Sequence, residues 1–196
     1  MSIRNRIKKI KYLRNKHVIC VLENPKLAVN LATTIRNVSA FGIEKVYIIG
    51  GYPGIPKTFD ESRRNKGLMG ASVGASRWVF IKHFETTEEC IKHLRKNWYK
   101  IAITSPHLKG QNNTELYSGN FTQKRLAVVF GNETDGISDI AVRDADLCIQ
   151  IPQGGVVESL NLGTATGIVL SYIRQQRLEF IEKGEKTKIP RRIKYG

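Results

Sequence analysis

Unbroken apolar runs alternate with helical patterns along most of this sequence. The apolar runs predict strands over residues 17–22, 45–51, 78–84, 99–104, 126–130 and 147–151. Helical patterns predict helices over residues 26–41 and 87–97, a short helix from near Ser138, and a final helix from about Ser159 to Glu182. Strands buried on both faces show continuous apolar runs. The pattern therefore predicts an α/β fold, with a mostly parallel sheet and helices on both faces.

Glycine, proline and polar residues mark the connections. Asn24-Pro25 breaks the first strand and leads into the first long helix, which Gly42 ends. Residues 52–76 contain several glycines and prolines and are predicted to be irregular. Residues 105–120 are predicted to form a polar loop.

The 196 residues suit one compact domain with short appended ends. Residues 1–16 place Ile3, Ile7, Ile10 and Leu13 on one stripe and predict a short basic amphipathic helix. We expect the domain itself at residues 17–182 and a basic tail at residues 183–196.

The charge lies mainly at the two ends. The chain carries 32 Lys and Arg against 17 Asp and Glu, a formal net charge of +15. Residues 1–16 hold seven basic residues and no acid, and residues 174–196 hold eight basic residues and three acids. The ends thus supply +12 of the +15, which favours binding of a polyanion such as RNA. Solvated basic tails without a binding role are the alternative.

Other composition features exclude several classes of protein. No apolar run reaches the roughly 20 residues that span a bilayer, and no signal-peptide pattern is present, so we expect a cytoplasmic protein without a membrane partner. Cys20, Cys90 and Cys148 are too scattered for a metal site or a disulfide framework. Cys20 and Cys148 are interpreted as small buried apolar residues. No metal-ligand cluster is visible, and no metal is expected.

Three polar loops follow predicted strands, where parallel sheets bind their ligands. They begin at Thr104, Gly131 and Pro152, and the last continues into Ser159-Leu160-Asn161. Each alone is weak evidence, because tight turns often need glycine for structural reasons. None is a P-loop, a dinucleotide fingerprint or a nucleophile elbow. His107 is the only histidine in one of these loops.

Together with one helix, two of these loops resemble a known set of motifs. Residues 30–42, NLATTIRNVSAFG, resemble the first motif of the SPOUT class of RNA methyltransferases. Within that class, they resemble the motif of the TrmH-like ribose 2′-O-methyltransferases. Residues 129–138, VFGNETDGIS, are similar to the second motif, and residues 151–161, which end in ESLN, to the third. The motifs occur in the family's order across roughly residues 17–175.

The resemblance implies a C-terminal trefoil knot, a homodimer and S-adenosyl-L-methionine as cofactor. Knots are too rare for the spacing of elements to predict one. The cofactor would lie against the loops that the knot brings together. The residues expected to bind it are Thr104, Ser105, Phe130, Gly131, Asn132, Ile151, Ser159 and Leu160.

The resemblance also implies catalytic residues. Arg36 matches the family's catalytic arginine, which would stabilise the ribose alkoxide and hold the adjacent phosphate, or abstract the proton; a surface helix arginine is the alternative. Asn30 is expected near Arg36 on one side of the helix, and Glu133 is expected to orient Arg36 or Asn30. Asn161 would bond to ribose or to loop carbonyls. Ser159 either joins the site or only caps the final helix.

The sequence departs from the family pattern at three places. Gln153-Gly154 replaces apolar residues, Asn37 replaces Thr or Ser, and Gly163 replaces Ser. These departures put fine cofactor contacts and substrate preference in doubt.

The short basic ends resemble those of tRNA-directed members, since this chain has about 16 residues before its first strand. We therefore expect 2′-O-methylation of tRNA, with a D-loop guanosine as the target, and rRNA as the alternative substrate. Phosphate-binding residues expected at the ends are Arg4, Arg6, Arg14, Arg174, Arg177, Arg191 and Arg192. A non-catalytic RNA-binding protein of the same fold and a nucleotide-dependent hydrolase are the competing functions.

Overall fold

The computed structural model describes residues 14–110 and 112–182. The predicted helix at the N-terminus, apart from its last residues, and the predicted tail at residues 183–196 lie outside the described residues. No helix in the described part of the chain is long and apolar enough to cross a membrane.

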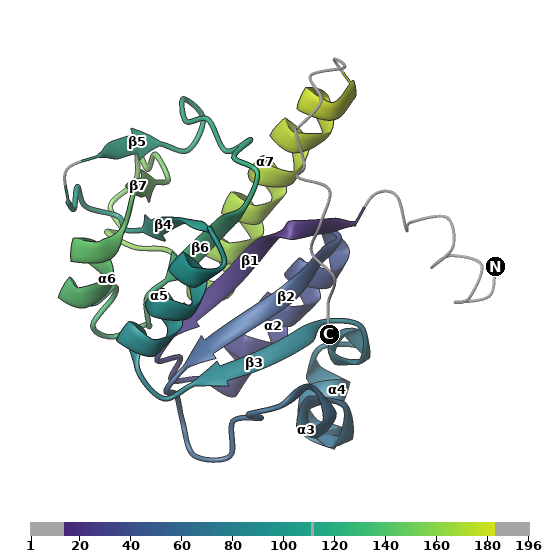
Figure 1. Cartoon of the computed structure of the whole chain (residues 1–196). Coiled ribbons are helices and arrows are strands. Elements are labelled where there is room, and N and C mark those ends of the chain that lie inside the picture. The colour runs from purple at the N-terminus through teal and green to yellow at the C-terminus, as the bar shows by residue number, and fades with distance from the viewer. Residues whose placement is uncertain (1–13, 111, 183–196) are drawn as a thin grey trace.

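The described residues form one seven-stranded sheet in which every pairing is parallel, in the order β3-β2-β1-β6-β4-β7-β5 (Figure 1). The strands are β1 (Asn15–Glu23), β2 (Ile43–Ile49), β3 (Phe80–Phe84), β4 (Lys100–Thr104), β5 (Asn113–Glu115), β6 (Leu126–Phe130) and β7 (Leu147–Gln150). The predicted α/β class with a parallel sheet is confirmed.

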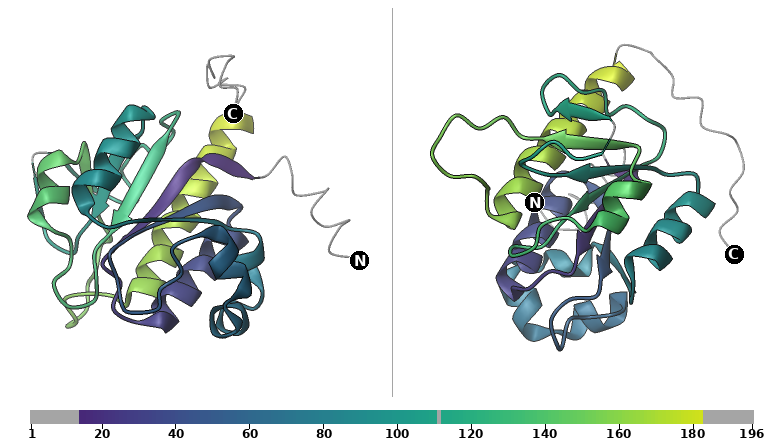
Figure 2. Two further views of the ribbon diagram at one scale, coloured as in Figure 1. Left: turned by 60° about the horizontal axis from the view of Figure 1, so that its bottom comes forward. Right: turned by 90° about the vertical axis from the view of Figure 1, so that its left-hand side faces the viewer.

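Helices cover both faces of the sheet, as predicted. α2 (Ala28–Ala40) and α7 (Leu162–Glu182) lie on one face, and α5 (Thr87–Lys96) and α6 (Asp139–Asp144) lie on the other (Figure 2). Along β1, Cys20 packs into the first core and Val21 into the second. Central strands with two buried faces explain why apolar runs, rather than alternation, marked them in the sequence.

α7 packs closely against α2. Thr34 and Thr166 are fully buried between them, and Asn37 donates hydrogen bonds to Gly163 O (2.8 Å) and to Thr166 Oγ1 (3.1 Å). A Cβ at Gly163 would lie 2.7 Å from the Thr33 methyl group, so a larger residue would push the helices apart. Two departures from the family pattern, Asn37 and Gly163, therefore complement each other in this contact.

The prediction that residues 52–76 are irregular is wrong. They contain α3 (Phe59–Arg64) and α4 (Lys66–Ala71), and the 3₁₀ turn η2 (Ala75–Arg77) begins at their end. Each α-helix has a side-chain cap: Thr58 accepts from Glu61 N, and Asn65 accepts from Leu68 N. Thr58 and Glu61 have capping-box spacing, a signal that the surrounding glycines and prolines outweighed.

Other element bounds also differ from the prediction by a few residues. The predicted loop over residues 105–120 contains the short strand β5, whose polar residues give no apolar signal. β1 begins at Asn15, two residues before the predicted start of the domain. The final helix begins at Leu162 rather than near Ser159.

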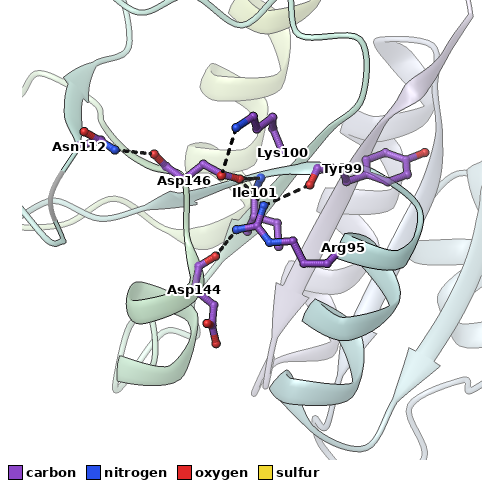
Figure 3. A network of polar contacts seen from close by, with 7 residues as sticks. All are labelled: Arg95, Tyr99, Lys100, Ile101, Asn112, Asp144 and Asp146. Atoms are coloured by element: carbon purple, nitrogen blue, oxygen red, sulfur yellow. Dashed lines mark hydrogen bonds and ion pairs between the residues drawn. The ribbon is translucent and has the colours of Figure 1, made fainter.

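A polar network ties α5 to the start of β4 and to the α6–β7 turn (Figure 3). The Asp146 carboxylate accepts from Arg95 at 2.5 Å and from the backbone of Ile101 at 2.7 Å, and it lies 3.4 Å from Lys100 Nζ. Burial alone would raise the pKa of Asp146, but these partners lower it below its usual value. The network closes the end of the sheet that lies away from the carboxyl ends of the strands.

All three cysteines are buried and free, which confirms the interpretation of Cys20 and Cys148. Burial raises the pKa of each thiol, to about 12 for Cys90. The part of the chain that the structure describes contains no group of three or more side chains that could hold a metal ion.

Candidate functional site

A cavity of about 300 Å³ opens at the carboxyl ends of β4, β6 and β7. The three loops singled out in the sequence form its walls, together with the start of α7. Every residue predicted to bind the cofactor lines this cavity: Thr104, Ser105, Phe130, Gly131, Asn132, Ile151, Ser159 and Leu160. A concave site with apolar walls and a few polar groups suits a small organic ligand.

The loop after β6 folds tightly back on itself. Asn132 and Gly136 exchange two backbone hydrogen bonds, of 3.0 and 3.2 Å. A Cβ placed on Gly131 would lie 2.1 Å from the carbonyl carbon of Gly136 and 2.3 Å from Ile137 N. Glycine at residue 131 is therefore required by the loop itself, in addition to any approach of a ligand.

Glu23, at the end of β1, holds this loop in place. It is 5% exposed and accepts hydrogen bonds from Ser138 N (2.8 Å), Ser138 Oγ (2.7 Å) and Thr87 Oγ1 (2.6 Å). One carboxylate thus joins the starts of α5 and α6, where helix N-termini favour negative charge. Glu23 was not predicted from the sequence. An acidic residue directly after a buried apolar run was the signal that could have identified it.

Glu133, Asn30 and Asn161 form a chain of side-chain hydrogen bonds across the three motifs. Asn30 donates to Glu133 Oε1, and Asn161 donates to Asn30 Oδ1 at 3.0 Å. Glu133 Oε2 also accepts from Lys26 N at 3.0 Å. Partial burial alone would raise the pKa of Glu133, but the bonds from Asn30 and the backbone of Lys26 lower it, so the carboxylate is ionised at neutral pH.

The hydrogen bonds of Asn161 correct the expectation for Ser159. Asn161 Oδ1 accepts from Gly163 N (2.8 Å) and Thr164 N (3.3 Å), and its carbonyl accepts from Ala165 N. Asn161 is therefore the N-cap of α7. Ser159 lies three residues before the helix on the wall of the cavity and does not cap it.

Arg36 lies apart from this chain of hydrogen bonds. It is exposed on α2, whereas Asn30 is buried, because six residues along a helix leave two side chains about 120° apart. The expectation that they are near neighbours is wrong, and Glu133 orients Asn30 rather than Arg36. Arg36 does not line the cavity, and it has no hydrogen bond or ion pair with the described residues.

Only three of the arginines expected to bind RNA are described. Arg177 is 8% exposed and donates to the carbonyls of Phe121 (3.0 Å) and Gln123 (2.6 Å), and its burial lowers its pKa to about 10. Arg177 is thus a structural residue, and its assignment to RNA binding is wrong. Arg14 forms an ion pair with Glu44 at 3.1 Å.

Arg174 is half-buried, and one of its guanidinium nitrogens is buried without a hydrogen-bond partner in the described structure. The remaining expected RNA contacts, Arg4, Arg6, Arg191 and Arg192, lie outside the described residues.

The cavity also has charged walls that the sequence analysis did not assign. Asp135 and Glu158 join Glu133 there, against Lys109 and His107. The predominance of carboxylates makes the cavity better suited to a ligand with a positive centre than to a polyphosphate.

Comparisons with known proteins identify the family of this chain. Residues 17–171 match the model of the SpoU rRNA Methylase family. The tRNA (guanosine(18)-2′-O)-methyltransferase of Borreliella burgdorferi is 28% identical over 197 residues, covering 97% of this chain and 82% of that protein. The Thermus thermophilus protein of the same name is 28% identical over 176 residues, with 90% of this chain and 84% of that protein covered.

Two solved structures share the fold. The TrmH/SpoU tRNA modifying enzyme from A. aeolicus has a TM-score of 0.73 and 27% identity, and covers 92% of this chain and 85% of its own. An AdoMet-bound rRNA methyltransferase from Sinorhizobium meliloti has a TM-score of 0.70 and 26% identity, over 81% and 56% of the two chains. The family model spans most of the chain, and the predicted resemblance is confirmed: this chain belongs to the SpoU rRNA methylase family.

Proposed function

We propose that this chain transfers a methyl group from S-adenosyl-L-methionine to a ribose 2′-hydroxyl of tRNA, with a D-loop guanosine as the target. The cavity at the carboxyl ends of β4, β6 and β7 is the observation that carries the proposal, because all eight residues expected to bind the cofactor line it. The names of the relatives from B. burgdorferi and T. thermophilus support tRNA and guanosine. The family description supports rRNA as the second candidate.

The residues present fit the cofactor. Phe130, Ile151 and Leu160 supply apolar surface for an adenine ring, and the turn from Gly131 to Ile137 forms one wall of the cavity. Glu133 and Glu158 supply negative charge for a sulfonium. When bound, S-adenosyl-L-methionine supplies an electrophilic methyl group, whose displacement requires alignment with the attacking oxygen.

Arg36 is the proposed catalytic residue of this chain. A ribose hydroxyl must lose a proton to attack, and a protonated arginine can stabilise the resulting oxyanion and hold the adjacent phosphate. Arg36 is exposed and free of partners among the described residues, so it can reach an incoming RNA. Arg36 does not belong to the hydrogen-bonded series Glu133, Asn30 and Asn161, so the two have different roles. Those three residues hold the cofactor loops, and Arg36 acts on the RNA.

The proposal includes a homodimer and a C-terminal trefoil knot. Exposed apolar side chains beside the site support a dimer: Val29 at 63%, Val156 at 101% and Val157 at 66%. The path of the chain supports the knot, since β6 and β4 lie between β1 and β7 in the sheet, yet the following α7 packs on α2. A tRNA substrate supports a cytoplasmic location.

The decisive experiment measures S-adenosyl-L-methionine binding by calorimetry and then maps 2′-O-methyl sites after reaction with an unmodified tRNA transcript. We expect binding, and one methylated D-loop guanosine. Transfer to rRNA instead would establish the second candidate. RNA binding without transfer would favour a non-catalytic RNA-binding protein, and phosphate release from a nucleotide would favour a hydrolase. Sedimentation should show a dimer, and an active monomer would contradict that part of the proposal.

A further inference from the structure

Trp98 occupies an unusual position at the C-terminus of α5. Tyr99 N donates to Leu94 O (3.1 Å) and Trp98 N donates to Arg95 O (2.9 Å), which together form a Schellman motif. This motif requires a left-handed residue at the position after the cap, where glycine is usual. Trp98 adopts it with φ of +61°. A bulky side chain is rarely found in this conformation.

The Trp98 side chain makes no packing contact among the described residues that would offset this backbone strain. It is 84% exposed, the most exposed aromatic side chain of the described residues. Tyr99, next to it, is buried and supplies the apolar contact at this turn. A residue that breaks a local rule without a gain in packing is a candidate for function.

Basic residues flank Trp98 along the chain and on the adjoining start of β6. Lys96 and Lys100 are exposed, and Lys124 and Arg125 are half-buried. Arg125 donates to Asn97 O at 2.6 Å, directly before Trp98, and its guanidinium lies 5.8 Å from the centre of the Tyr99 ring. We call Trp98, Lys96, Lys100, Lys124 and Arg125 the Trp98 platform.

The acids near the platform are Asp144 and Asp146, and both already have partners. Asp146 pairs with Arg95 and Lys100 (Figure 3), and Asp144 pairs with Arg143 at 3.0 Å. In the described structure no carboxylate lies within ion-pair distance of the remaining three cations, Lys96, Lys124 and Arg125. The platform is therefore net positive and free to meet an anion.

Neighbouring strands extend the positive region. Val18 of β1 pairs with Leu126, which pairs with Lys100, so the first residues of β6 and β4 meet β1 here. Burial lowers the pKa of His17, and the charges of Arg177, Arg125, Lys45 and Lys124 lower it further. Positive charge thus extends from the platform to His17 at the start of β1.

The platform lies at the opposite edge of the sheet from the cavity. β4 runs from Lys100, beside the platform, to Thr104, on the wall of the cavity. At about 3.3 Å per residue, the two ends of β4 are about 13 Å apart, a separation that a folded RNA can span. The platform and the cavity therefore can contact different parts of one RNA molecule.

We propose that the Trp98 platform is a second RNA-binding site, where the indole stacks on an unpaired base and Lys96, Lys124 and Arg125 contact the flanking phosphates. An exposed aromatic ring among cations is the chemistry that binds single-stranded nucleic acid. Unpaired bases can stack in this way, whereas bases within an RNA helix cannot. The inference rests on the proposed function only in taking RNA as the substrate.

The test compares Trp98→Gly, Trp98→Phe and Val73→Gly in the full chain. Val73 is the matched control: it occupies the same position of a Schellman motif after α4, with φ of +54°, and is 70% exposed. Both glycine variants should raise Tm, because glycine adopts this conformation without strain. Only Trp98→Gly should weaken binding of a tRNA transcript, by about tenfold, as when a stacked base is lost. Trp98→Phe should retain most of the affinity.

A second measurement reports on the indole directly. Trp78→Phe leaves Trp98 as the only tryptophan, and its fluorescence should be quenched by an oligouridine but not by a blunt RNA duplex. Unchanged tRNA affinity in Trp98→Gly, equal losses in both glycine variants, or a change from dimer to monomer would overturn the platform. Calorimetry with S-adenosyl-L-methionine separates these outcomes from failure of the proposed function, since cofactor binding should be unaffected in every variant.

Discussion

Gly131→Ala tests whether the crowded turn after β6 forms the cofactor pocket. The new Cβ would lie 2.1 Å from the carbonyl carbon of Gly136, whereas contacts between non-bonded carbon atoms have an optimum near 3.5–4.0 Å. One side of the turn must move by about 1.5 Å to reach that distance. Phe130 cannot move easily, because β6 is paired with β1 and β4. The displacement therefore falls on Gly136 and Ile137.

Moving Gly136 and Ile137 should lower the stability of the fold and displace one wall of the cavity. Ile137 is 4% exposed, and the next residue, Ser138, is held by Glu23, so moving them disturbs packing as well as the turn. Overpacking of this kind costs roughly 1–3 kcal/mol. For a chain of this size, each kcal/mol lowers Tm by about 2–4 °C. The fold should survive, but the wall formed by Asn132 to Ile137 should be displaced.

Calorimetric titration with S-adenosyl-L-methionine and thermal unfolding together check this prediction. We expect at least about a tenfold loss of affinity, which corresponds to 1.4 kcal/mol. Gly154→Ala is the matched control, since a Cβ at Gly154 meets no atom within 4 Å. It should change neither Tm nor affinity. If Gly131→Ala bound the cofactor as tightly as the unmodified chain while its Tm fell, the cofactor would lie elsewhere.

Three further predictions address catalysis, RNA binding and stability. Arg36→Ala should abolish methyl transfer and leave cofactor affinity within about twofold, because Arg36 lies off the cavity; retained transfer would remove it from the mechanism. Removal of residues 183–196, which carry six of the basic residues, should weaken tRNA binding and reduce its dependence on salt concentration. An unchanged affinity for tRNA would contradict a role of these residues in RNA binding. Asp146→Asn should cost about 1–2 kcal/mol at pH 7, allowing for partial exposure. Because the folded-state pKa of Asp146 is lowered, this contribution is complete well above the unfolded-state pKa of about 4 and is lost as the pH falls through the lower folded-state pKa. Denaturant titrations of both proteins at pH 7 and at successively lower pH should therefore show the difference in stability shrinking below about pH 4.

The sequence predicted those parts of the fold that depend on burial. β6 was predicted at residues 126–130, as observed, because all five side chains are buried. β5 was missed because its three residues are polar or exposed and become a strand only by pairing with β7. No local pattern encodes such a pairing.

The site shows the same division. The eight residues expected to bind the cofactor could be named from the sequence, because the three polar loops that carry them follow recognisable strands. The role of Arg177 could not, because a helix pattern does not reveal that Phe121 and Gln123 place carbonyls beside that guanidinium. Likewise the capping role passed from Ser159 to Asn161, since either residue suits an N-cap by type and only the path of the chain decides between them.

Asn30 joins the three motifs, and its two bonds have opposite polarity. Its amide nitrogen donates to ionised Glu133, and its oxygen accepts from Asn161. Asn30→Asp keeps the size and the acceptor but sets one carboxylate against another, so it should lose more cofactor affinity than Asn30→Ala. Adding Glu133→Gln should restore much of that loss, because the glutamine amide can donate to the new carboxylate while its oxygen still accepts from Lys26 N. Calorimetry on the unmodified chain, Asn30→Asp, Glu133→Gln and the double variant measures this coupling. Additive losses in the double variant would mean that Asn30 and Glu133 act on the cofactor independently, and that the motifs are not joined through this bond.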